Sequence, residues 1–154
     1  MTIIHHWLSV RPRRLELEEL LKILVEEHGH VKSLLERLDM LLREGRYSEA
    51  AEELSGFKPY LDQHVIDEEA TVLKTLLEAY GRDGAERGVK VFQEHREIHQ
   101  LISEMRAAAS TSPQRLAEKR DRLREILKRH FRAEEDDIFP WALETYRRRM
   151  GAAK

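Results

Sequence analysis

The chain has 154 residues, no cysteine, and 27 Lys and Arg against 29 Asp and Glu, for a formal net charge of -2. That length fits one domain with a sizeable core, and the charge balance does not indicate a nucleic-acid partner. The lack of cysteine excludes disulfides, thiolate metal sites and cysteine nucleophiles. No apolar run approaches the ~20 residues of a membrane span, and the N-terminus lacks a signal-peptide pattern, so we expect a cytoplasmic protein without a membrane partner.

Charged residues make up 36% of the chain and aromatic residues 6%, a composition that favours long helices over sheet. Residues 1–14 are expected to form an irregular lead-in. A first helix is predicted for residues 15–43, where apolar residues recur in alternating steps of four and three, the pattern of a helix packed in a bundle. A second helix is predicted for residues 48–80, with a disturbance at Gly56 and Pro59.

A loop at residues 81–84 separates this hairpin from a third helix at 85–109. The Ser112-Pro113 pair signals the start of a fourth helix, which Pro140 should kink or end before a charged tail. Four helices joined by short connections predict an all-α fold. We expect an antiparallel up-down-up-down four-helix bundle over residues 15–148, with a short N-terminal extension.

Histidine and glutamate occupy positions where the helical pattern calls for apolar residues. His28 fills the one gap in the apolar stripe of the first helix. His64 and Glu68 are four residues apart, as are His130 and Glu134, and residues at this spacing lie on the same face of a helix. The predicted metal ligands are five histidines and two glutamates: His28, His64, His95, His99, His130, Glu68 and Glu134.

The two halves of the chain repeat these motifs. Glu27-His28 recurs as Glu94-His95, and His64 to Glu68 recurs as His130 to Glu134. The repeat predicts two helical hairpins, related by a pseudo-twofold axis, that bring their ligands to one level of the core. His99 has Lys32 as its counterpart, so one ion would have three histidines and the other two. The ion with two histidines would keep an open position for a small molecule.

One histidine on an apolar face is more often an ordinary core residue than a ligand. Seven such groups are different, because neighbouring Leu, Val and Ile side chains cannot satisfy their buried charges and hydrogen-bond donors. We therefore favour a metal site. Imidazole with carboxylate suits iron, and by ligand type alone also manganese or zinc.

Residues next to the predicted ligands have supporting roles in this interpretation. Glu69 and Glu135 are expected to be solvated or to orient imidazole N–H groups, with Glu135 as the alternative bridge to Glu134. Tyr60, one turn before His64, either donates to the site or packs in the core. His30 is expected at the surface. The histidines at positions 5 and 6 are left out of the site.

This ordered set of motifs resembles the hemerythrin family, in particular the hemerythrin-like HHE cation-binding domain. The resemblance implies a non-haem di-iron centre bridged by two carboxylates, Glu68 and Glu134, and by an oxo or hydroxo group. It also implies a distribution of the histidine ligands, with one iron on His95, His99 and His130 and the other on His28 and His64.

The last motif departs from the oxygen-carrying branch of that family, which has an aspartate five residues after its histidine. Here Glu134 stands at four and Glu135 at five, the pattern of the broader HHE branch. We expect a di-iron protein that binds dioxygen or a related small diatomic, and we lean towards binding rather than turnover. The alternatives are a di-iron oxidase, a peroxidase, a nitric-oxide-handling enzyme, or a metal, oxygen or redox sensor. The sequence does not indicate an oligomeric state.

Overall fold

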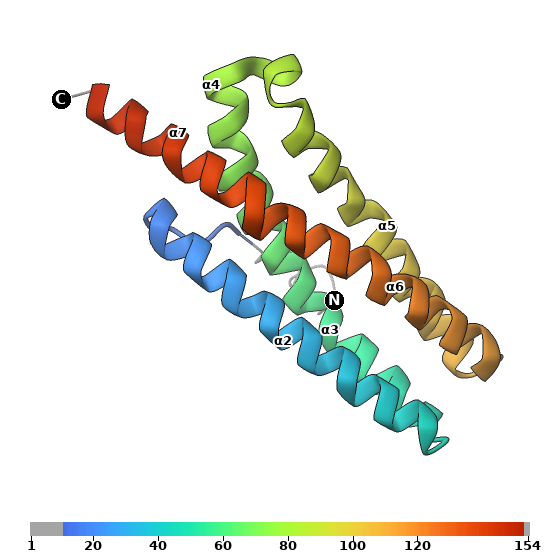
Figure 1. Cartoon of the computed structure of the whole chain (residues 1–154). Helices are drawn as coiled ribbons and strands as arrows, with labels where there is room; N and C mark the ends of the chain where they lie inside the picture. Colours follow the sequence, from blue (N-terminus) through green and yellow to red (C-terminus); the bar gives the residue numbers. More distant parts are fainter. Residues whose placement is uncertain (1–10, 153–154) are drawn as a thin grey trace.

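A computed structural model describes residues 11–152, and all regular elements in this range are helical. They form four antiparallel arms (Figure 1), which confirms the predicted all-α bundle. The elements follow the chain as α2 (Leu17–Arg43), α3 (Tyr47–Asp67), η1 (Glu68–Leu73), α4 (Lys74–Gly84), α5 (Glu86–Ala109), α6 (Pro113–Ala133), η2 (Glu134–Ile138) and α7 (Phe139–Ala152). Among the described helices, none combines the length and apolarity needed to cross a lipid bilayer.

The second arm is disturbed at a different place from the one predicted. Gly56 and Pro59 both lie inside α3, which continues through them. Pro59 is exposed, so water can donate a hydrogen bond to the carbonyl that has no amide donor because of the proline. The irregularity lies further on, in η1, a π-helical segment that joins α3 to α4. The arm turns at Gly81, whose φ of 69° suits glycine.

The fourth arm also differs from prediction, because helix continues beyond Pro140 to the end of α7. Pro140 is the second residue of α7, and the π-helical segment η2 just before this helix already departs from the hydrogen bonding that proline interrupts. The residues after it are not simply a solvated tail. Ala142 and Thr145 are buried, and Thr145 Oγ1 lies 2.9 Å from the Tyr80 hydroxyl. Figure 1 shows α6 and α7 as one gently bent arm.

Buried apolar side chains form two clusters separated by a polar level. The first cluster surrounds Leu38, Met105 and Leu123, and the second surrounds Leu20 and Leu76. Each arm passes from one cluster to the other. The residues that flank the polar level along the four arms are Leu24 and Val31, Leu61 and Val72, Phe92 and Ile98, and Leu127 and Ile138. Six of the seven predicted ligands therefore lie between two apolar layers, buried from solvent.

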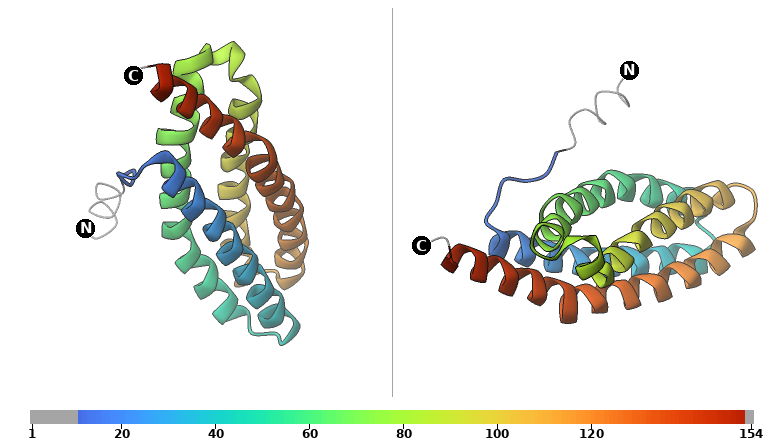
Figure 2. Two further views of the ribbon diagram at one scale, coloured as in Figure 1. Left: turned by 60° about the vertical axis from the view of Figure 1, so that its left-hand side comes forward. Right: turned by 90° about the horizontal axis from the view of Figure 1, so that it is seen from above.

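Residues 11–16 precede α2 without forming a helix. They run across the outside of α3 (Figure 2), where Gln63 Nε2 donates to the Arg11 carbonyl at 2.7 Å.

Candidate metal centre

The structure brings six of the seven predicted ligands together at the polar level between the apolar clusters. They form two groups of four, and the ligand atoms of each group lie within 4.8 Å of one another. One group is His28, His64, Glu68 and Glu134; the other is His95, His130, Glu68 and Glu134. All six side chains are buried, and the two shared glutamates are 0% exposed.

The local structure repeats between the halves of the chain. His28 comes from α2 and its counterpart His95 from α5. The other ligands come from the two arms that contain π-helical segments, and Glu68 and Glu134 are the first residues of η1 and η2. Short π-helical stretches inside α-helices occur frequently at functional sites. In this chain both begin at a central glutamate.

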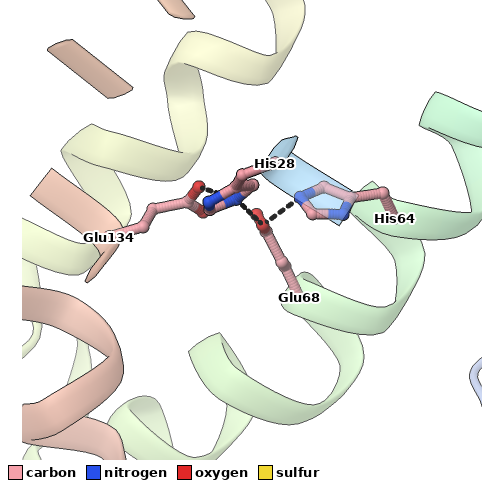
Figure 3. Close-up of side chains that lie close together, drawn as sticks. All are labelled: His28, His64, Glu68 and Glu134. Carbon is pink, nitrogen blue, oxygen red and sulfur yellow. Dashed lines mark ion pairs between the residues drawn. The ribbon is translucent and has the colours of Figure 1, made fainter. Parts of the chain in front are cut away.

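Each glutamate contacts one histidine from each group. Glu68 Oε1 lies 2.6 Å from His64 Nε2, and its Oε2 lies 2.8 Å from His95 Nε2. Glu134 Oε1 lies 3.2 Å from the Nε2 atoms of both His28 and His130. Figure 3 shows the first group, with the His28 ring between the two carboxylates. The carboxylates therefore span the two groups as bridging ligands would.

A cation fits the chemistry of these atoms. Within the described residues, the four Nε2 atoms and the four glutamate oxygens are buried and have no hydrogen-bond partner. Leaving such groups unpaired in an apolar core costs about 1–3 kcal/mol each, and more when they are charged. Imidazole nitrogen and carboxylate oxygen are ligands for iron, manganese and zinc, so a bound cation would satisfy all eight atoms.

A second layer of four glutamates faces the opposite nitrogen of each imidazole. The pairs are His64 Nδ1 with Glu27 Oε1 at 3.0 Å, His130 with Glu94, His28 with Glu135, and His95 with Glu69, the last three at 3.2 Å. We call Glu27, Glu69, Glu94 and Glu135 the outer carboxylates. A carboxylate at Nδ1 favours the tautomer with the proton there, which leaves the Nε2 lone pair directed at the site.

The outer carboxylates follow the repeat of the sequence. Glu69 and Glu135 lie where they can orient imidazole N–H groups, and it is Glu134 that lies between the two groups of histidines. No role was predicted for Glu27 and Glu94. The available signal was the Glu-His doublet, which recurs at the same place in both halves.

The structure does not place His99 with the other ligands. Its side chain is 34% exposed, and its Nδ1 lies 3.8 Å from Asp62 Oδ1 of α3. Burial lowers the pKa of His99, against the opposing effect of Asp62. His99 lies one turn further along α5 than His95, next to Asp62 of α3, and its ring atoms are not among the two groups of ligand atoms. Each described group thus holds two histidines, in place of the expected three and two.

Tyr60 and His30 also lie outside the two groups. Tyr60 is partly exposed on α3, and its hydroxyl has no hydrogen-bond partner among the described residues. Burial, followed by the charge of Glu27, raises the pKa of Tyr60 to about 12. His30 is exposed, with its ring 6.3 Å from that of Tyr60. The histidines at positions 5 and 6 fall outside the described residues.

The ionisable side chains of the site differ in the direction of their pKa shifts. Burial lowers the pKa of His64, but Glu68 and Glu27 outweigh it and raise the pKa to about 10. Burial and the charge of Glu68 raise the pKa of Glu134 well above its ordinary value. Burial acts in the same direction on Glu68, but the contacts with His64, Glu134 and His28 hold its pKa low. At neutral pH a cation would therefore displace a proton from His64.

A four-helix bundle whose core holds four imidazoles around two shared carboxylates defines a class of helical cation-binding proteins. The family model of the hemerythrin HHE cation binding domain matches residues 19–143, most of the chain. The chain therefore belongs to the hemerythrin HHE cation-binding family. Comparisons with curated proteins and with solved structures gave no match.

Proposed function

We propose that this protein holds a pair of iron ions and uses them to bind dioxygen or a related small diatomic. The observation that carries the proposal is the sharing of Glu68 and Glu134 between two pairs of histidines in a buried layer. His28 and His64 would hold one ion, and His95 and His130 the other. Bound iron would supply the redox-active centre and an open coordination position for the diatomic.

The surroundings of the ligands support binding of a small uncharged molecule. The His28 ring stacks on Phe131 with centroids 3.9 Å apart, and the His95 ring stacks on Phe92 at 5.3 Å. These rings belong to the apolar clusters on either side of the site. A dry, apolar site limits side reactions with water and leakage of protons. Dioxygen and nitric oxide can enter such a layer without losing strong hydration.

A second candidate function is a redox enzyme that uses the same residues. The two groups contain equal numbers of histidines, so an external ligand would have room at both positions rather than at one. Iron held by histidine and carboxylate with open positions is typical of non-haem oxygen chemistry. A metal, oxygen or redox sensor with the same centre is a further alternative.

Metal content per chain and the visible spectrum of the reduced protein, taken before and after exposure to air, would test the proposal. Two irons and a new absorption band that disappears on degassing support a diatomic binder. Two irons that convert to a stable ferric form, with turnover of peroxide or nitric oxide in the presence of a reductant, favour the enzyme. Two irons without either response favour the sensor. Purified protein that rejects iron would overturn the proposal, while uptake of zinc alone would preserve only the cation site.

A further inference from the structure

Arg13 lies outside the bundle helices but contacts two carboxylates beside His64. Its Nε donates to Asp67 Oδ2 at 2.6 Å, and its backbone N–H donates to Asp67 Oδ1 at 2.8 Å. Its Nη2 lies 3.0 and 3.1 Å from the two oxygens of Glu27. Glu27 is on α2 and Asp67 is on α3, so one guanidinium links the two helices that hold His28 and His64.

The link ends at a ligand of the metal centre. Glu27 Oε1 is bound to Arg13 and lies 3.0 Å from His64 Nδ1. The guanidinium is planar and its Nε is held by Asp67, so the Nη2 atom that contacts both oxygens of Glu27 is held in one direction. The position of Arg13 therefore determines the orientation of the Glu27 carboxylate relative to His64.

In the second half of the chain an arginine also binds the carboxylate beside the histidine, but it comes from a different position in the sequence. Glu94, the counterpart of Glu27, accepts from Arg129 Nε at 3.1 Å and Nη2 at 2.7 Å. Arg129 directly precedes His130, whereas Gln63 precedes His64. Gln63 instead binds the Arg11 carbonyl and Asp67, and so helps hold the segment that carries Arg13.

Asp67 departs from the repeat, because it is a buried carboxylate at a position where the second half of the chain has a small apolar residue. It is 0% exposed, and its counterpart in the second half is Ala133. A buried carboxylate is costly unless it is paired, and the hydrogen bonds from Arg13 and Gln63 provide that pairing. Asp67 is therefore best explained as the anchor for Arg13.

We propose that Arg13 is a positioning residue of the metal centre, which acts on the ion held by His64 through Glu27. The inference rests on the two-ion centre proposed above. It implies that the segment before α2 forms part of the site, and that the two cation positions depend on different arginines. The Arg13 side chain is 34% exposed and that of Arg129 is 64% exposed, so the His64 position depends on the better-buried contact.

The test compares full-length variants by competition for Zn²⁺ against a chromogenic chelator, which resolves two binding steps. Arg13→Ala is compared with wild-type protein, and because it leaves the Asp67 charge buried, the Arg13→Ala/Asp67→Asn double variant repeats the comparison without that charge. Arg14→Ala is the matched control, because Arg14 is the exposed neighbour with the same charge. The imidazole N–H signals of Co²⁺-loaded protein provide a second readout.

Loss of Arg13 should weaken one binding step by about tenfold, at the lower end of what outer partners of metal ligands contribute. The other step and the Arg14→Ala control should stay unchanged, and one imidazole N–H should exchange faster with solvent. A purely structural role would lower the thermal stability of metal-free protein and leave both steps unchanged. That result, or equal weakening of both steps, would overturn the inference. Wild-type protein that binds fewer than two ions would overturn the proposed centre itself.

Discussion

Oε1 of Glu27 lies 3.0 Å from Nδ1 of His64, although the two residues belong to neighbouring helices. This contact leaves the other imidazole nitrogen facing Glu68 at 2.6 Å. A single interhelical contact thus orients one candidate metal ligand, and an equivalent carboxylate contact is present at each of the other three histidines. The centre should therefore be sensitive to residues that do not contact the cation.

The first prediction concerns the outer carboxylates. Replacing Glu27 or Glu94 by Gln removes the charge that favours a proton on Nδ1 and should weaken cation binding about 10–100-fold. Competition with a chromogenic chelator measures the change. Glu26→Gln is the control, because Glu26 is exposed and adjacent to Glu27. Unchanged affinity in the Glu27 and Glu94 variants would show that these carboxylates do not support the ligands.

The second prediction separates His99 from His95. His99→Ala should keep two cations per chain, because His99 lies towards Asp62, while His95→Ala should lose one. Elemental analysis of protein purified under identical conditions measures the stoichiometry. Loss of a cation from His99→Ala would restore the division into three and two histidines expected from the sequence.

The third prediction is that cation binding at neutral pH releases protons. The pKa of His64 is raised to about 10, so this imidazole carries an extra proton at pH 7 when no cation is bound, and the raised pKa of Glu134 acts in the same direction. Because a ligand must lose its proton to bind, cation affinity should increase from pH 6 to pH 8. Calorimetry in two buffers of different ionisation enthalpy measures the proton release. Equal apparent enthalpies in the two buffers would contradict it.

The fourth prediction concerns stability. A cation that binds only the folded state, at 100 times its dissociation constant, adds about 2.7 kcal/mol. For a domain of this size, that corresponds to a rise in Tm of about 5–10 °C. Thermal unfolding of chelator-treated protein with and without Fe²⁺ under anaerobic conditions measures the shift. Mg²⁺, which prefers oxygen ligands, should have little effect and serves as the control.

Much of the fold and of the site could be predicted from residues close together in sequence. The spacing of apolar residues predicts the four helices, and the Glu-His doublets and four-residue spacings predict six candidate ligands that the structure brings together. This works because a helix converts spacing along the chain into position on a face. The π-helical segments were not predicted, since they depend on how each arm packs around its central glutamate.

The sequence by itself determined the class of fold, the repeat and the chemistry of the ligands, because all of these follow from helical periodicity and residue type. Only the tertiary structure decided which imidazoles meet. It turned His99 towards Asp62 and placed Arg13 between Glu27 and Asp67, 14 and 54 residues away in the chain. Such contacts depend on the rotation and packing of whole helices, and periodicity within a single helix carries no information about them.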